Sequence, residues 1–484
     1  MNRLWRTARY VVYCAVVLCT SSLAAEDSAP PDIRYEAGRR LRQFEDNWRQ
    51  TTDLQARRRA IAPLKQAVNQ FLGGKQLAAA ESLDRARLAL HFAEEPSPQV
   101  RWAESLYISF ARRLLDAGQP SLTVRLENLY IPAVEIPAEA VLELRVVNSE
   151  GQGFLKRHAA ITAPICTVDI PLVELGEGDW IARYDILVDE KRLSSGDVRF
   201  SLVKELSERL TAATKALDFA AQPDTIDRGS TKALVKLLSG LAGGDHLETD
   251  FPGLRLIVEI EQALAAHKAG ETFYKAARSG EFWLQLPIKG NVVPVRIFVP
   301  ECSPPTAACP LVVALHGAGG SENLFFDGYG HGAIVDECRR RGWIVLSPRT
   351  SGFGLLPVVE LIDALAANYE IDRSRVFLVG HSMGAIQATA AAQADPARYA
   401  AIAALGGGGV AKASEAIKRL PYFVAAGSED FALPGVRRLV SNLQKSGVEK
   451  VVFREYPDLE HLLIVQESLP DVFRFFDEAS AEVR

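Results

Sequence analysis

The spacing of hydrophobic positions changes several times along this 484-residue chain, and each change predicts a different kind of structure. Over 26–118, apolar residues recur every three or four positions, as in AAAESLDRARLALHFAEE, which is typical of amphipathic helices. Over 119–204 the period becomes two, and segments such as SLTVRLENLYI and WIARYDILVDE predict a small antiparallel β-sandwich. Helical spacing returns over 205–270, which we interpret as a helical linker region.

The last region, 271–484, alternates strand patterns with helical patterns. Its strand candidates are FWLQLPI, VVPVRIFVP, LVVAL, WIVLSP, RVFLVG, YAAIAAL, YFVAAG and VVFREY. Several of them lack polar alternation, as strands covered on both faces do, which predicts a mostly parallel, doubly wound α/β sheet. Because no long insertion separates YAAIAAL from YFVAAG, where lids commonly lie, we expect an open cleft.

The first 25 residues differ from the rest of the chain. A start with three arginines precedes the apolar stretch YVVYCAVVLC, which is too short to span a bilayer, and small residues follow at Ser22 and Ala24. This pattern predicts a cleaved secretory signal over 1–25, with an uncleaved anchor as the alternative. The mature chain is therefore expected in the periplasm or outside the cell, without stable membrane insertion.

Charge and cysteine content narrow the function classes. The formal net charge is −5, and removing three arginines with the signal makes it about −8, which argues against nucleic acid as a partner. Cys302 and Cys309 flank a Pro-rich loop and are candidates for a local disulfide in an oxidising compartment.

No CxxC pair or His/Cys cluster predicts a metal site. The glycine run 406–409 lacks GxGxxG spacing, so it predicts a cleft-lining or flexible loop and no cofactor site.

The strongest chemical signal is GHSMG at 380–384, between a buried-strand pattern and a helical pattern. A sharp turn from strand to helix leaves no room for side chains at Gly380 and Gly384, and it lifts the hydroxyl of Ser382 out at the edge of the sheet. The motif therefore predicts Ser382 as a nucleophile.

A serine hydroxyl needs a base to take its proton, and the base needs an acid that orients it. The only histidine after this serine is His461, just beyond the last predicted strand. The acid should follow the strand YFVAAG, where Asp430 is our choice and Glu429 the alternative. Asp458 and Glu460 lie near the histidine in sequence and are expected to be loop and surface charges.

The developing oxyanion needs hydrogen-bond donors. One should be the backbone N–H of Met383, directly after the nucleophile. The other should come from the loop HGAGG at 316–320, where we favour the N–H of Ala318, with Gly317 as the near alternative. His316 precedes the nucleophile and ends a strand, which favours a structural role.

From about Thr272 onward the sequence resembles the α/β-hydrolase superfamily, most closely the branch of predicted peptidases, extracellular esterases and polyhydroxybutyrate-depolymerase-like esterases. The resemblance is carried by LVVALHGAGGSE, RVFLVGHSMGA, AAGSEDFALP and the EH of YPDLEH, and it covers under half of the chain. Ala385 departs from it, since many relatives carry a further glycine there. The resemblance implies acyl transfer through a covalent acyl-enzyme, without a cofactor.

Three functions follow as hypotheses. The first is an exported serine hydrolase that cleaves carboxylic esters. Its expected substrates are esters or other acyl-bearing compounds, polymers among them. The second is a serine peptidase of the same fold, and the third is a non-catalytic envelope binding protein with a degenerate hydrolase domain. The region 119–204 is similar in pattern to immunoglobulin-like sandwiches, and it and the helices either bind a partner or pack onto the hydrolase.

Overall fold

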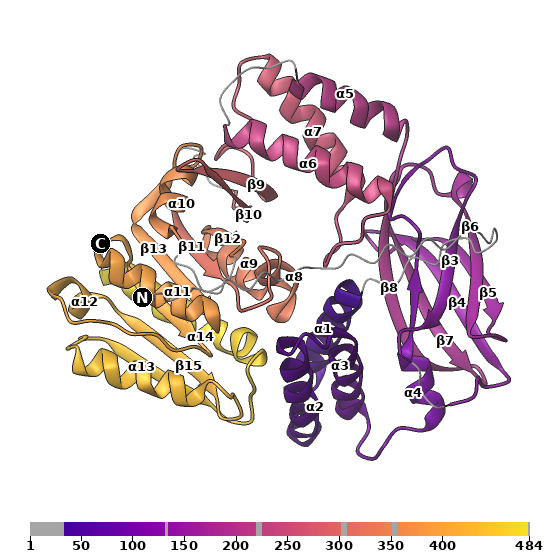
Figure 1. Cartoon of the computed structure of the whole chain (residues 1–484), viewed down its shortest axis with the longest axis horizontal. Helices are drawn as coiled ribbons and strands as arrows, with labels where there is room; N and C mark the ends of the chain where they lie inside the picture. The colour runs from indigo at the N-terminus through magenta and orange to yellow at the C-terminus, as the bar shows by residue number, and fades with distance from the viewer. Residues whose placement is uncertain (1–32, 131–133, 219–224, 302–306, 351–355, 483–484) are drawn as a thin grey trace, which may run out of the picture. The chain divides into compact units, whose positions relative to one another are not determined.

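The C-terminal region is built on an eight-stranded sheet (Figure 1). The computed structural model describes residues 33–130, 134–218, 225–301, 307–350 and 356–482. The strands of this sheet are β9 (Gly280–Ile288), β10 (Asn291–Val299), β11 (Cys309–Leu315), β12 (Ile344–Pro348), β13 (Ile371–His381), β14 (Ala401–Leu405), β15 (Tyr422–Gly427) and β16 (Val451–Tyr456). Every strand candidate of this region is confirmed.

The strands lie in the order β16-β15-β14-β13-β11-β12-β10-β9. The strands from β16 to β12 pair in parallel, whereas β9, β10 and β12 pair antiparallel. The carboxyl ends of β11, β13, β14, β15 and β16 therefore meet at one edge. Because ligands of open α/β sheets bind at this edge, the loops that follow these strands are where a site is expected.

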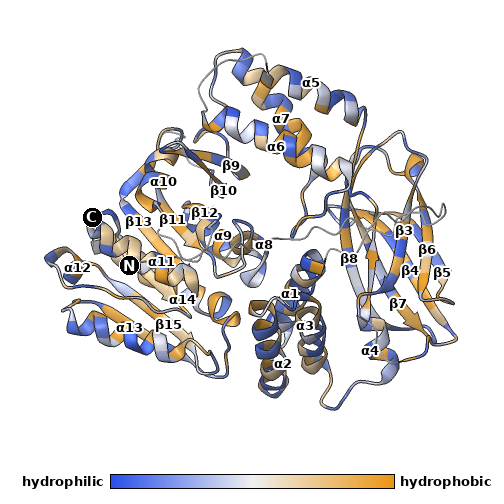
Figure 2. Ribbon diagram, in the orientation of Figure 1, coloured by the Kyte–Doolittle hydropathy of each residue, from blue (hydrophilic) through white to orange (hydrophobic). Residues whose placement is uncertain are grey.

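Both faces of the sheet are buried, which explains the continuous apolar runs. In β11, Leu311, Val313 and Leu315 pack into the core on one face, and Val312 and Ala314 into the core on the other. Figure 2 shows the hydrophobic colour along the central strands. The first face is covered by α10 (Val358–Leu365), α11 (Met383–Ala394), α12 (Glu415–Arg419) and α13 (Leu433–Lys445), and the second by α8 (Leu324–Asp327), α9 (Tyr329–Arg341) and α14 (Leu463–Glu482).

Four helices open the described part of the chain: α1 (Ile33–Gln50), α2 (Leu54–Leu72), α3 (Gln76–His91) and α4 (Pro98–Ser105). The side chain of Asp53 accepts from the first turn of α2 and starts that helix. Apolar side chains of α1, α2 and α3 share a core with Leu459 and Leu463 of the C-terminal region. The helical pattern expected to 118 ends at Ser105, because two strands too short for a readable period follow: β1 (Leu106–Ser109) and β2 (Leu114–Asp116).

The middle region is the expected sandwich of two sheets. Its other strands are β3 (Ser121–Asn128), β4 (Ala140–Asn148), β5 (Gly153–Ala160), β6 (Ile165–Pro171), β7 (Gly178–Val188) and β8 (Lys191–Val203), with a short 3-10 turn at Leu172–Glu174. The sheets have the orders β1-β3-β6 and β2-β8-β7-β4-β5, and their inner faces form one core. The pair β2 and β8 is parallel, which departs from the all-antiparallel prediction.

Three further helices, α5 (Leu206–Asp218), α6 (Ile226–Gly243) and α7 (Gly253–Lys268), follow the sandwich. Their apolar faces pack together and against Val203 of the sandwich and Trp283 of β9, so the described residues form one compact unit. Among the described helices, none has the length and hydropathy needed to cross a bilayer. The predicted signal over 1–25 and Cys302 of the predicted disulfide lie outside the described residues.

Candidate active site

Ser382 occupies a strained turn between β13 and α11. Its backbone has φ 55° and ψ −114°, a left-handed conformation that non-glycine residues rarely adopt. A Cβ atom at Gly384 would lie 1.9 Å from the carbonyl oxygen of Leu315, and one at Gly380 would lie 2.2 Å from the oxygen of Gly384. The two motif glycines are therefore required by close backbone contact, as the sequence predicted.

The predicted base and acid are in direct contact. Nδ1 of His461 lies 2.8 Å from Oδ1 of Asp430, both side chains are buried, and the N–H of Ala432 donates to the same oxygen. With Nδ1 held in this way, Nε2 is the nitrogen left to accept a proton. Glu429, the alternative acid, instead forms an exposed ion pair with Lys65.

One pocket of about 170 Å³ brings the predicted residues together. Ser382, His461 and the loop 317–321 all line it. Within the described residues, no hydrogen bond joins the serine hydroxyl to the imidazole. Such bonds are often long in resting enzymes and tighten only when substrate binds.

The loop after β11 forms a tight turn. The N–H of Gly320 donates to the oxygen of Gly317 at 3.2 Å, and Gly319 has φ 78°, which suits glycine at the third position of a type II turn. This turn bond uses neither the N–H of Gly317 nor that of Ala318, so both predicted donors stay candidates.

His316 and Met383 frame this loop. Nδ1 of His316 donates to the oxygen of Gly317 at 2.8 Å, and Nε2 accepts from the N–H of Thr350 at 3.1 Å. Burial lowers the pKa of His316, which keeps the ring neutral and the loop fixed. Met383 is the first residue of α11, where helical N–H groups have no partner within the helix.

Comparison with known proteins identifies the fold family of this region. Residues 310–480 match the Alpha/beta hydrolase family. The C-terminal region has the α/β-hydrolase fold. This confirms the superfamily that the motifs predicted, and it names neither a branch nor a substrate.

Solved structures with a similar hydrolase region include a ferulic acid esterase, at 17% identity over 42% of this chain and 99% of that chain with a TM-score of 0.37. A second is FphF, a fluorophosphonate-binding serine hydrolase of Staphylococcus aureus, at 15% identity over 41% of this chain and 98% of that chain with a TM-score of 0.35. A third is an S-formylglutathione hydrolase from Agrobacterium tumefaciens, at 18% identity over 42% of this chain and 95% of that chain with a TM-score of 0.34. A search of curated proteins returns no match. Among the residues that the structure describes, no group of three His, Cys, Asp or Glu side chains is placed to hold a metal ion.

Behind the hydrolase pocket, a buried tyrosine and histidine connect the loops of the site. The hydroxyl of Tyr329 lies 2.6 Å from Nδ1 of His381, and Nε2 of His381 lies 2.7 Å from the carbonyl oxygen of His461. Because a carbonyl only accepts, Nε2 carries the proton and Tyr329 donates to Nδ1. Burial, followed by the nearby charge of His461, holds the pKa of His381 well below its usual range. The half-exposed ring of Phe431 packs on His461 with centroids 4.2 Å apart.

Helix α1 supports this tyrosine of the hydrolase region. Tyr329 and the next three residues all have positive φ, which the sequence GYGHG accommodates with alternating glycines. The N–H of Gly330 donates to the buried carboxylate of Glu45 at 3.2 Å, and His331 pairs with Asp46 at 2.7 Å. Burial raises the pKa of Glu45 to about 7. The sequence motifs did not point to this segment, although the alternating glycines of GYGHG could have indicated its positive φ angles.

The glycine run after β14 packs against Asp430, His461 and the backbone of Ser382. A Cβ atom at Gly406 would lie 2.9 Å from Oδ2 of Asp430, and one at Gly407 would lie 2.3 Å from the carbonyl oxygen of Ser382. The first two glycines are therefore needed for close packing. This run is not among the described residues that line the 170 Å³ pocket.

Glu460 corrects a second expectation. It is only 1% exposed, and its Oε1 accepts from the N–H groups of Leu462 and Leu463 at the start of α14. Burial raises its pKa to about 7. The carboxylate folds back to cap a helix, which the loop-like sequence did not reveal. Asp458 is half-exposed and pairs with Arg58, as expected for a surface charge.

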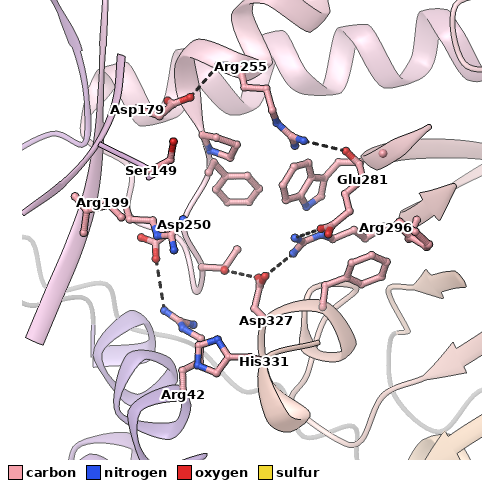
Figure 3. Close-up of a pocket in the computed structure, with 18 of the residues that line it drawn as sticks. Arg42, Ser149, Asp179, Arg199, Asp250, Arg255, Glu281, Arg296, Asp327 and His331 are labelled. Atoms are coloured by element: carbon pink, nitrogen blue, oxygen red, sulfur yellow. Dashed lines mark hydrogen bonds and ion pairs between the residues drawn. The ribbon is translucent and has the colours of Figure 1, made fainter. Parts of the chain in front are cut away.

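A second, larger cavity of about 1010 Å³ lies next to the hydrolase pocket (Figure 3). Figure 3 shows basic and acidic side chains that meet across it, with Arg296 bonded to Glu281 and Asp327 at 2.9 and 2.8 Å. Arg42, Thr249 and Asp327 line both cavities, so the two adjoin there. The predicted catalytic residues are not among the described residues that line the larger one.

Proposed function

We propose that this chain is a serine hydrolase that cleaves carboxylic esters through an acyl-enzyme. The observation that carries the proposal is the meeting of three loops in one pocket: the strained Ser382, the His461–Asp430 pair and the glycine loop 317–321. A serine at a left-handed turn is strained without benefit to packing, and such strain is typical of nucleophile elbows.

In the proposed reaction, Oγ of Ser382 attacks the ester carbonyl while Nε2 of His461 takes the hydroxyl proton. The tetrahedral intermediate collapses, the bond to the alcohol oxygen breaks, and His461 returns the proton to the alcohol. Water, deprotonated by the same nitrogen, then attacks the acyl-enzyme and releases the acid with Ser382 restored. Asp430 holds the imidazole in the required tautomer and stabilises its charged form.

For the oxyanion we propose the N–H groups of Met383 and Ala318. Ala318 is the second residue of the turn closed by Gly317 and Gly320, and it lines the pocket with Ser382, which supports its N–H as the donor, with Gly317 as the alternative. The donors act where substrate excludes water, and losing one typically costs about 3–4 kcal/mol of transition-state stabilisation. The turn at Gly319 fixes the direction of the Ala318 N–H before substrate arrives.

The test is hydrolysis of p-nitrophenyl acetate and butyrate by the purified mature chain, beside Ser382→Ala. Ser239→Ala, on an exposed face of α6, is the control, because it removes a serine hydroxyl elsewhere in the chain. We expect turnover that Ser382→Ala abolishes and Ser239→Ala preserves. A fluorophosphonate should add one adduct to the wild type, detected by intact mass, and none to Ser382→Ala.

The same assay separates the other functions. Turnover of peptide nitroanilides without turnover of esters would establish the peptidase instead. If neither substrate is cleaved and Ser382 is not labelled, the binding-protein hypothesis replaces the enzyme. We also propose export, on the pattern of residues 1–25, and N-terminal sequencing of protein from periplasm and medium tests it.

A further inference from the structure

The pocket around Ser382 has an apolar wall that comes from outside the hydrolase region. The family match begins at residue 310, yet α1, α2 and α3 contribute 11 of the 27 residues that line the pocket. The larger apolar residues that these helices place on it are Leu41, Val68, Phe71, Leu72 and Leu83. Part of the wall of the pocket therefore comes from the N-terminal helices.

This wall touches the oxyanion loop. A Cβ atom at Gly319 would lie 2.7 Å from the ring of Phe71, so the ring packs directly on the loop backbone. Arg34 of α1 donates to the carbonyl oxygen of the same glycine at 3.2 Å. A group bound to the nucleophile beside this loop therefore meets Phe71 and its neighbours first.

The helices are held in place by specific contacts with the hydrolase region. Nε1 of Trp48 donates to Glu467 of α14 at 2.8 Å, and side chains of α1, α2 and α3 share a core with Leu459 and Leu463. Lys65 of α2 pairs with Glu429, which directly precedes the triad acid. The apolar wall is thus a fixed part of the site.

We propose that α1, α2 and α3 form the acyl-binding surface of the enzyme, and that its substrates are esters of apolar, medium-length acyl groups. The inference rests on the esterase function proposed above. An apolar group that leaves water for this wall gains binding free energy with each buried methylene. The helices then act as specificity determinants for the reaction at Ser382.

The two cavities explain why the acyl group, rather than the alcohol, takes the apolar wall. The acyl group stays on Ser382 through the intermediate, whereas the alcohol must leave and water must enter. The larger polar cavity, which shares Arg42, Thr249 and Asp327 with the apolar pocket, has room for the leaving alcohol and the incoming water (Figure 3). The apolar pocket offers the acyl chain burial instead.

The experiment measures kcat/KM for p-nitrophenyl esters from acetate to dodecanoate. For the wild type we expect a rise of about fourfold per methylene until the pocket is full, then a plateau or fall. Octyl acetate is included because it places the same chain on the alcohol side. We expect it to be cleaved no faster than ethyl acetate.

Two variants on the same helix make a matched pair. Leu72 lines the pocket and is 50% exposed, whereas Leu54 begins α2, is 66% exposed and lies away from the pocket. We expect Leu72→Ala to lower the octanoate-to-acetate ratio of kcat/KM about fivefold, and Phe71→Ala about tenfold, because each loses apolar contact with the chain. Leu54→Ala should keep the wild-type ratio within about twofold.

The outcomes separate this inference from the proposed function. Absence of ester turnover and of Ser382 labelling would defeat the esterase proposal itself. Ser382-dependent turnover with equal ratios in Leu72→Ala, Phe71→Ala and wild type would leave the esterase standing and overturn the role of the helices. A chain-length preference found with octyl acetate, and lost in Leu72→Ala, would assign the wall to the alcohol and overturn the acyl assignment.

Discussion

The hydroxyl of Tyr329 is connected through His381 to the proposed base, His461, and Tyr329→Phe removes this hydroxyl alone. In the folded protein the hydroxyl donates to Nδ1 of His381, whose Nε2 donates to the carbonyl oxygen of His461. The phenylalanine keeps the ring and its packing against Phe325 and the His381 ring. The change therefore isolates the hydrogen bond to His381.

The magnitude follows from Nδ1 of His381, which is left without its donor. A buried acceptor that loses its partner costs about 1–3 kcal/mol, so we expect the free energy of unfolding to fall by about 1–3 kcal/mol. The control is Tyr422→Phe. Tyr422 is fully buried, and its hydroxyl has no partner among the described residues, so its removal should be neutral or slightly stabilising.

Tyr329 is a positioning residue in this view, so kinetics must distinguish it from a purely structural one. We expect kcat for p-nitrophenyl butyrate to fall about tenfold with KM little changed, because the imidazole loses support while the acyl wall stays intact. Urea titration and steady-state kinetics of both variants provide the measurements. An unchanged kcat in folded Tyr329→Phe, or a stability loss no larger than that of Tyr422→Phe, would refute the reasoning.

Three other changes test the triad, the α1 contact and the elbow. Asp430→Asn should lower kcat about 10³–10⁴-fold in the ester assay, whereas Glu429→Gln should stay within about twofold, and the reverse result would reassign the acid. Burial raises the pKa of Glu45 from 4.5 to about 7, so the folded state binds the proton more tightly and stability falls as pH rises through this window. In urea titrations, Glu45→Gln should match the wild type near pH 4 and exceed it by about 3 kcal/mol at pH 8, and equal stability at both pH values would contradict the burial argument. Gly384→Ala should cost more than about 4 kcal/mol or prevent folding, because its Cβ would meet the oxygen of Leu315 at 1.9 Å, and a wild-type urea midpoint would show that the turn relaxes.

The fold of the C-terminal region was readable from the sequence because it depends on local patterns, and the proposed chemistry was inferred from motifs of the same kind. Strands buried on both faces must be continuously apolar, and the parallel sheet was predicted from runs of this kind such as LVVAL and VFLVG. The elbow requires glycines on both sides of Ser382, and the chain order of acid and histidine then led to Asp430 and His461. The short strands β1 and β2 escaped, because three or four residues carry no readable period.

The sequence by itself determined which side chains carry the proposed chemistry, since motif spacing and strand ends place Ser382, Asp430 and His461 at one sheet edge. Only the tertiary structure decided what surrounds them. Tyr329 reaches His381 across 52 positions, and Phe71 packs on Gly319 from a helix nearly 250 positions earlier in the chain. Contacts at such separations depend on how whole elements pack, and packing between elements leaves no periodic signal in either segment alone.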